Sequence, residues 1–229
     1  MNYSAQVVFI VSGDSDVRSS LECVLSARGL HTVSFETAAE YLACATPSVP
    51  ACLVLDVELP DTGGLDLQQQ LMGAGPPIVF VTRHADLACA VRAIKAGALD
   101  FLAMPFDPQQ LLRAVQAALD ICDSARAQHE KLKEIGDRYA RLTPRERQVL
   151  RRVVSGLLNK QVAAELGISE ITVQIHRQRV MRKMRAASFA DLVRFAGLLR
   201  VPFDDDTFVG AAVPMYYATP PYQMLQMQR

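Results

Sequence analysis

The chain has 229 residues, of which 50% are hydrophobic and 21% are charged, and its formal net charge at pH 7 is zero. This length and composition predict one large or two ordinary domains with buried cores. No apolar run approaches the roughly 20 residues of a membrane helix, and residues 1–12 do not resemble a signal peptide, so we expect a cytoplasmic protein that does not contact the membrane. Five scattered cysteines without CxxC spacing are expected to be buried free thiols rather than a redox or metal site.

The first 120 residues alternate short β-rich runs with helical stretches. Helices are expected at about 15–28, 37–45, 64–72 and 85–96, with another that starts at Asp107. The expected strands are Val7–Val11, Thr32–Phe35, Cys52–Leu55, Ile78–Val81 and Leu99–Ala103. This alternation predicts a parallel sheet that helices cover on both faces. The loops after the carboxyl ends of the strands then form the expected functional edge.

A long helix is predicted after the last strand. From Leu111 to Leu142, apolar or small residues recur with an unbroken spacing of three and four, which is typical of a coiled-coil-like seam. Alanine and glutamine weaken this seam, and Gly136 is a position where the helix is expected to bend or end. Two interpretations stay open. The seam joins two copies of the chain, or the helix is a linker that packs on its own domains.

Residues 141–200 contain the signals of four helices. A capping box from Thr143 to Glu146, with Pro144 at the first helical position, opens a helix that ends near residue 156. The other helices are expected at 159–166, from 170 to about 185 and from 188 to about 200. Gly167 stops the second helix and Ser169 caps the third. Two helices joined by such a short turn predict a helix-turn-helix.

The charges are distributed unevenly along the chain. Residues 1–120 have 13 acidic and 6 basic residues, whereas residues 141–200 have 4 acidic and 13 basic residues. A basic segment of this size predicts a polyanion as its partner. On its third helix, Gln174, Ile175 and Gln178 share one face and basic residues surround them, a layout suited to base edges flanked by phosphates. Residues 201–229 have little periodicity and are expected to form an irregular tail.

The stretch LTPRERQVLRRVVSGLLNKQVAAELGISEITVQIHRQRVMRKMRAASFADLVRFA resembles the LuxR-type helix-turn-helix of the NarL/FixJ response regulators. The resemblance includes the motifs T-P-R-E, G-x-x-N-K and I-S-x-x-T-V-x-x-H. It implies an all-α, four-helix domain that binds double-stranded promoter DNA. It further implies that the DNA backbone is approached by Asn159, Lys160, Thr172, Arg177 and Lys183. The positions that it implies for contacts with bases are Gln174, Ile175 and Gln178.

Residues 1–120 resemble the receiver domain of the same regulators. The resemblance implies an α/β, flavodoxin-like domain with a five-stranded parallel sheet in the order 2-1-3-4-5. The segment LVLDVELPDTGGLDL matches the phosphoacceptor segment and places Asp56 at the end of the third strand. VTRHAD places Thr82, the switch hydroxyl, at the end of the fourth strand. The matching switch aromatic on the fifth strand is Phe101.

The chain departs from the receiver pattern at the positions that support phosphotransfer. Formation of an acyl phosphate on Asp56 needs Mg²⁺, which acidic side chains after the first strand hold, and a lysine that pairs with the phosphate. Ser12 and Gly13 replace the acidic pair, and Met104 replaces the lysine. Ordinary phosphotransfer is therefore not expected.

Two charged residues near the expected pocket have alternative interpretations. Asp14 aligns one place after the missing acids, where it either serves as a surviving metal ligand or caps the first helix. Arg83 replaces the usual small residue after Thr82. We hypothesise that Arg83 forms an ion pair with Asp14 or Asp56 in the pocket, because a buried, unpaired carboxylate is costly. The alternative is an Arg83 side chain that points into solvent.

These features predict a receiver-like domain at 1–120, a helical linker at 121–140, a LuxR-type DNA-binding domain at 141–200 and a tail at 201–229. The expected function is that of a sequence-specific transcriptional regulator of the two-component response-regulator type. Two hypotheses for the receiver-like domain stay open. It is a phosphorylation-independent dimerisation or ligand-binding module, or it is a conventional switch phosphorylated on Asp56 with an altered metal site.

Other classes of function find little support in the sequence. No nucleophile–base pair, metal cluster or glycine-rich phosphate loop is apparent, so we expect no enzyme activity, no cofactor and no metal. The expected partners are promoter DNA, a second copy of the chain in a homodimer, and a sensor kinase or a small-molecule ligand.

Overall fold

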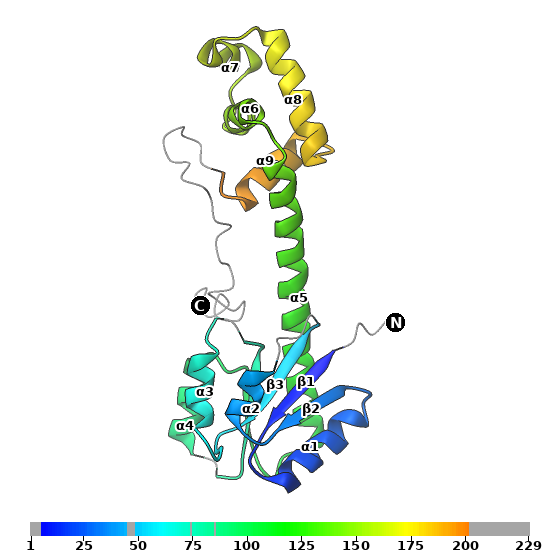
Figure 1. Ribbon diagram of the computed structural model, residues 1–229, viewed down its shortest axis with the longest axis vertical. Helices are drawn as coiled ribbons and strands as arrows, with labels where there is room; N and C mark the ends of the chain where they lie inside the picture. Colours follow the sequence, from blue (N-terminus) through cyan, green and yellow to red (C-terminus); the bar gives the residue numbers. More distant parts are fainter. Residues whose placement is uncertain (1–5, 45–48, 74, 85, 202–229) are drawn as a thin grey trace. The chain divides into compact units, whose positions relative to one another are not determined.

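The computed structural model of the chain describes residues 6–44, 49–73, 75–84 and 86–201 (Figure 1). The chain divides into two compact units, with the division between Arg126 and Ala127. This division lies inside the segment 121–140 that the sequence indicates as a linker. The expected irregular tail lies outside the described residues, except for Val201. In the part of the chain that is described, no helix is both long and apolar enough to span a bilayer.

The first unit is built on a parallel sheet of five strands in the order β2-β1-β3-β4-β5, as the resemblance to receiver domains implied. The strands are β1 (Val7–Val11), β2 (His31–Phe35), β3 (Ala51–Asp56), β4 (Ile78–Thr82) and β5 (Asp100–Ala103). Every residue of β1, β3 and β4 is buried, which explains why these strands are apolar rather than alternating, apart from the polar residues Asp56 and Thr82 that end β3 and β4. The register aligns the carboxyl ends of these three strands, and this edge of the sheet holds the receiver pocket described below.

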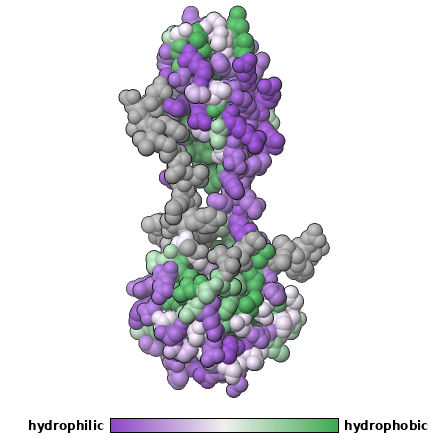
Figure 2. Space-filling model, in the orientation of Figure 1, coloured by the Kyte–Doolittle hydropathy of each residue, from purple (hydrophilic) through white to green (hydrophobic). Residues whose placement is uncertain are grey.

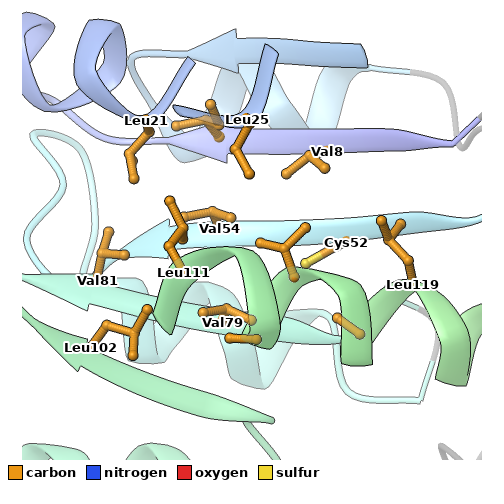
Figure 3. Packing of buried hydrophobic residues seen from close by; sticks show 14 of the residues in the cluster. Val8, Leu21, Leu25, Cys52, Val54, Val79, Val81, Leu102, Leu111 and Leu119 are labelled. Atoms are coloured by element: carbon orange, nitrogen blue, oxygen red, sulfur yellow. The ribbon is translucent and has the colours of Figure 1, made fainter. Parts of the chain in front are cut away.

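Helices cover both faces of this sheet. They are α1 (Ser15–Ser26), α2 (Ala38–Ala43), α3 (Gly64–Gln70), α4 (Leu87–Lys95) and α5 (Pro108–Ala140). On one face, Leu21 and Leu25 of α1 and Leu111 and Leu119 of α5 pack against the strands (Figure 3). On the other face, α2, α3 and α4 contribute the buried residues Tyr41, Leu67 and Ala93. The two faces thus have separate apolar cores.

The second unit contains the four expected helices, α6 (Pro144–Val154), α7 (Asn159–Leu166), α8 (Glu170–Met184) and α9 (Phe189–Leu198). The capping box of Thr143 and Glu146 opens α6, and Ser169 caps α8 through its side chain. Gly167 ends α7 with a backbone φ of 62°, a left-handed conformation that favours glycine. The short turn that follows leads directly into α8, so α7 and α8 form a helix-turn-helix.

Helix α5 is 33 residues long and continues through Gly136, where the sequence predicted a bend or an end. Both ends of its apolar seam are buried in the cores of their own units. Leu111 and Ala118 are fully buried in the first unit, and Ile135 lies in a core of the second. For these ends, the structure agrees with the interpretation of a helix that packs on its own domains.

The cysteines of the described residues form no disulfide bonds with one another, but the expectation that they are buried was wrong for most of them. Only Cys52 is buried, whereas Cys23 and Cys44 are exposed. Cys23 lies on the outer face of α1, between the core positions Leu21 and Leu25. A scattered pattern of cysteines does not reveal the face of a helix to which each belongs.

Candidate DNA-binding surface and receiver pocket

Helix α8 has one buried face and one exposed face. Val173, Val180 and Met184 lie in the cores of the second unit and fix the rotation of the helix about its axis. This rotation exposes the residues expected to face bases, which are Gln174, Ile175 and Gln178. Hydrophilic residues dominate the visible surface along α8 (Figure 2). An exposed helix of this kind is suited to the major groove of DNA.

An open groove joins the start of α7 to the exposed face of α8. Asn159, Gln174, Arg177 and Gln178 are among its lining residues. Arg177 donates a hydrogen bond of 3.2 Å from Nη1 to Oδ1 of Asn159, and its guanidinium carbon lies 5.0 Å from the centre of the Phe189 ring. These two contacts orient the guanidinium before any ligand binds, because stacking and hydrogen bonding restrict its rotamers.

The remaining residues expected at the DNA backbone have different surroundings. Lys160 is exposed on the first turn of α7. Thr172 is half-buried at the start of α8, where its hydroxyl lies 2.9 Å from that of Ser169. Lys183 is bound within the protein, with Nζ 2.6 Å from Oε2 of Glu146. Lys183 is therefore not a free surface cation like Lys160.

Other basic side chains of the second unit also bind groups of the protein. Arg145 donates a hydrogen bond of 2.6 Å to the carbonyl oxygen of Leu166, which joins α6 to the last turn of α7. Arg152 of α6 forms a 2.8 Å ion pair with Glu165 of α7. The excess of basic residues therefore overstates the charge available to a polyanion. Counting charges along the sequence could not distinguish these internal cations from exposed ones.

The receiver pocket is a cavity of about 320 Å³ at the carboxyl edge of the sheet. Its lining residues are Gly13, Asp14, Asp56, Glu58, Leu59, Pro60 and Arg83. Asp56 is 7% exposed, and its carboxylate accepts hydrogen bonds from the hydroxyl of Ser12 at 2.7 Å and the backbone N–H of Glu58 at 3.2 Å. Burial raises the pKa of Asp56, although the hydrogen bond from Ser12 and that from the Glu58 backbone oppose the shift.

Arg83 extends over this pocket and forms an ion pair with Asp14. Nη1 of Arg83 lies 2.5 Å from Oδ2 of Asp14, and 56% of the Arg83 side chain is exposed. The other carboxylate oxygen of Asp14 caps α1, since it accepts hydrogen bonds from the backbone N–H groups of Asp16 and Val17 at 2.8 and 3.1 Å. These backbone hydrogen bonds are the main reason that the pKa of Asp14 is lowered, and Arg83 adds to the effect.

The two expected switch residues lie on adjacent strands, Thr82 at the carboxyl end of β4 and Phe101 near the start of β5, where it pairs with Phe80. The hydroxyl of Thr82 is hydrogen-bonded to the backbone N–H and carbonyl of His84, at 3.1 and 3.2 Å. Phe101 is half-buried, with its ring centre 6.1 Å from that of Phe80. Thr82 is 1% exposed, so its hydroxyl is committed to the loop that follows β4.

The two units match two different family models. Residues 8–116 match the response regulator receiver domain, and residues 140–196 match the luxR family of bacterial regulatory proteins. Nodulation protein W of Bradyrhizobium diazoefficiens is 45% identical over 85% of this chain and 87% of its own length. The transcriptional regulatory protein FixJ of Azorhizobium caulinodans is 42% identical over 87% of this chain and 96% of its own length.

A solved structure agrees with these sequence matches. The response regulator StyR has a TM-score of 0.77 and 40% identity to this chain, and the match covers 85% of this chain and 99% of StyR. The chain belongs to the response regulators with a LuxR-family DNA-binding domain. Members of this family are transcriptional regulators that bind DNA.

The pocket of this response regulator does not fit the Mg²⁺ ion that its receiver family implies. Mg²⁺ prefers carboxylate oxygens and water in a nearly octahedral arrangement. Ser12 offers only a hydroxyl, which already donates to Asp56, and Asp14 is occupied by the α1 N-terminus and Arg83. A Cβ atom at Gly13 would lie 3.0 Å from Cδ of Pro60, so Pro60 would have to shift slightly to admit a side chain at this position. Among the described residues, no group of three histidine, cysteine, aspartate or glutamate side chains is arranged to hold a metal ion.

The phosphate-binding lysine of the receiver family also has no counterpart in this pocket. Met104 at that position packs against the core between the sheet, α1 and α5.

One contact near the pocket that the sequence analysis did not predict is the hydrogen bond of 2.5 Å from Nη1 of Arg18 to the carbonyl oxygen of Ser12. It fixes the loop from which Ser12 reaches Asp56. The only sign of this hydrogen bond in the sequence was a basic residue, Arg18, at the fourth position of α1.

Proposed function

We propose that this response regulator controls transcription through α8 and that its receiver-like domain works without phosphorylation of Asp56. The observation that supports the second part is the set of internal partners in the pocket. Ser12 donates to Asp56, and Arg83 pairs with Asp14 where the family places acids for a metal. Without those acids and without the lysine, the charge of an incoming phosphoryl group would lack its usual compensation.

The Arg83–Asp14 ion pair is the part of this proposal that distinguishes the chain from a conventional receiver. Arg83 is the one basic side chain among the described residues that line the pocket, its charge is paired with Asp14, and it covers the pocket from the β4 side. In this role it keeps Thr82 and Phe101 in a single arrangement, so that the domain is held in one state rather than switched. The input is then a partner protein or a small-molecule ligand instead of a phosphoryl group.

Asp56 phosphorylation is tested with acetyl phosphate and with beryllofluoride in the presence of Mg²⁺. We expect no label on Asp56 and no change in DNA affinity for the wild-type protein, and the same affinity for Asp56→Asn. The combined variant Ser12→Asp, Gly13→Asp, Arg83→Ala and Met104→Lys restores the missing groups and serves as the matched comparison. A Mg²⁺-dependent gain in the DNA affinity of the wild type that Asp56→Asn abolishes would contradict the proposal.

A conventional phosphorylation switch is the second candidate, because Asp56 and Thr82 are both present at the expected strand ends. In that case Asp14 would have to leave the α1 N-terminus or share its carboxylate with a metal ion. Arg83→Ala would then increase labelling of Asp56, since it removes the competitor for Asp14. Under the proposed function, Arg83→Ala alone leaves Asp56 unlabelled, because Ser12, Gly13 and Met104 still provide no acid and no lysine.

For the DNA-binding half, we propose that Gln174, Ile175 and Gln178 read bases in the major groove. Glutamine pairs with adenine through two hydrogen bonds, and isoleucine contacts the thymine methyl group. Asn159, Lys160, Thr172 and Arg177 lie around these residues and are proposed to bind the DNA backbone.

Gln174→Ala tests the readout of bases. We expect this variant to lose about 1–3 kcal/mol of discrimination at one position of the binding site and to keep its affinity for unrelated DNA. Lys160→Ala is the matched comparison, and it should weaken binding to all sequences to a similar extent. Both are measured by selection from a randomised duplex library followed by fluorescence anisotropy. An unchanged sequence preference of Gln174→Ala would contradict the assignment.

A further inference from the structure

Charged contacts hold the end of α8 from inside the second unit. Nζ of Lys183 lies 2.6 Å from Oε2 of Glu146 on α6 and 3.3 Å from the carbonyl oxygen of Arg141. The carbonyl oxygen of Met184, the next residue, accepts a hydrogen bond of 3.3 Å from Nη1 of Arg138 on α5. The last turn of α8 is therefore joined both to α6 and to the end of α5.

The contact with Lys183 compensates the charge of a buried carboxylate, that of Glu146. Its side chain is 3% exposed, and a carboxylate buried to this extent is costly unless it has a counter-charge and hydrogen bonds. Besides Lys183, its partners are the groups of the α6 capping box, and the backbone N–H of Thr143 donates to Oε2 at 2.8 Å. Burial raises the pKa of Glu146, but the hydrogen bond from Lys183 and that from Thr143 outweigh it, so that the pKa lies below its ordinary value.

We infer that Lys183 is a positioning residue for DNA binding and not a ligand of DNA phosphate. By neutralising Glu146 it fixes the carboxyl end of α8 against α6, and thereby the direction in which Gln174 and Gln178 face. The inference rests on the proposed function of α8. A move of the ammonium to a phosphate would leave the Glu146 carboxylate buried without its counter-charge. Arg179 and Arg182 are exposed on the same helix and are better placed for phosphates.

The two roles of Lys183 predict opposite effects of removing Glu146. If Lys183 were a phosphate ligand, Glu146→Gln would free its ammonium, strengthen DNA binding and steepen the dependence of log K on log salt. If Lys183 is a positioning residue, Glu146→Gln and Lys183→Met both weaken binding, because each removes the ion pair that fixes the end of α8 against α6, and Lys183→Met also leaves the buried Glu146 without its counter-charge. In neither variant does the salt slope change, since no phosphate contact is gained or lost.

The experiment uses the full-length protein and a short labelled duplex of mixed sequence, titrated at several salt concentrations. Arg179→Ala is the matched control, and it should reduce the salt slope by about 0.9. We expect Lys183→Met and Glu146→Gln each to lower affinity by about tenfold at an unchanged slope. The double variant should lose less than the two single variants together, because it leaves no unpaired buried charge.

Circular dichroism and urea unfolding accompany each titration. If Lys183→Met does not fold at the working temperature, Lys183→Arg replaces it, and this charge-conserving variant should restore both affinity and stability. A Lys183→Met protein of wild-type stability whose salt slope falls by about 0.9 overturns the inference, as does a Glu146→Gln protein that binds more tightly. Absence of any DNA binding by the wild type would instead overturn the proposed function of α8.

Discussion

At the scale of single residues, the two aspartates of the pocket are in opposite electrostatic situations. Asp56 is buried at the end of β3, and its pKa is raised because burial outweighs its hydrogen bonds. Asp14 lies at the α1 N-terminus, and its pKa is lowered by backbone N–H groups and Arg83. Asp14 thus has partners that favour its charged form, whereas Asp56 is a retained carboxylate whose charge costs stability.

The raised pKa of Asp56 leads to a prediction for stability against pH. Between the pKa of the unfolded chain and the higher pKa of folded Asp56, only the folded protein keeps the proton, so stability falls as pH rises through this window. At pH values above this window, the buried charge of Asp56 destabilises the folded protein by its full free-energy cost. We therefore expect Asp56→Asn to raise Tm by about 1–4 °C at pH 7, with a difference that closes as pH falls.

Asp61 provides the control for this measurement by differential scanning calorimetry. The pKa of Asp61 is lowered, mainly by the hydrogen bond from the backbone N–H of Ala39. The charged form of Asp61 therefore stabilises the folded protein, and this stabilisation is lost as pH falls. Asp61→Asn should accordingly lower Tm at pH 7 and have no effect at acid pH. An Asp56→Asn protein that is less stable than the wild type at pH 7 would show that the charge of Asp56 is well compensated.

At the scale of elements, α5 belongs to the core of the second unit as well as to that of the first. Ile135 is 2% exposed and packs with Leu150, Val180 and Met184. Tyr139 packs against the same cluster. The end of α5 is therefore a fifth helical segment of the DNA-binding unit, and the boundary at residue 141 that the sequence predicts cuts through its core.

This packing predicts where a stable DNA-binding fragment must begin. We expect a fragment of residues 127–201 to fold cooperatively, and a fragment of residues 141–201 to be less stable by about 2–5 kcal/mol, since it lacks Ile135 and Tyr139. Urea unfolding followed by circular dichroism measures the difference. Within the longer fragment, Ile135→Ala should reproduce most of the loss, whereas Leu132→Ala, at a half-buried position, should not. Equal stability of the two fragments would contradict this role of α5.

At the scale of the whole molecule, an acidic receiver-like half and a basic DNA-binding half are joined in one chain. The segment 1–120 has 13 acidic and 6 basic residues, and the segment 141–200 has 4 and 13. Because several of the basic side chains bind protein groups, such as Arg145, Arg152 and Lys183, fewer of them can act on DNA. A single copy therefore offers a modest electrostatic contribution to binding.

We expect the full-length chain to bind DNA as a homodimer on paired half-sites about 10 base pairs apart. One helix-turn-helix buries too little surface for high specificity, so a second copy must supply the rest. Sedimentation of the complex at saturating protein measures the stoichiometry, and insertion of about 5 base pairs between the half-sites should abolish cooperative binding. One copy bound per site at saturation would contradict the prediction.

The helices, the strands and the family could be predicted from the amino-acid sequence. Alternating β-rich and helical runs, the Thr143 capping box and the left-handed Gly167 all act through local geometry, and the structure confirms the helices and strands that they predicted. The motifs around Asp56 and Thr172 were long enough to show which two domains the chain contains. The replacements at Ser12, Gly13 and Met104 were also visible directly.

The partners of the charged side chains became known only from the three-dimensional fold. Lys183 and Lys160 look equivalent along the chain, but one binds a buried glutamate 37 residues away and the other faces solvent. Arg83 had two open interpretations, and the fold places it on Asp14. The same holds for the end of α5, whose seam fits either a second chain or its own core. Periodicity and charge fix what a residue can contact, whereas packing between distant elements determines which contact is made.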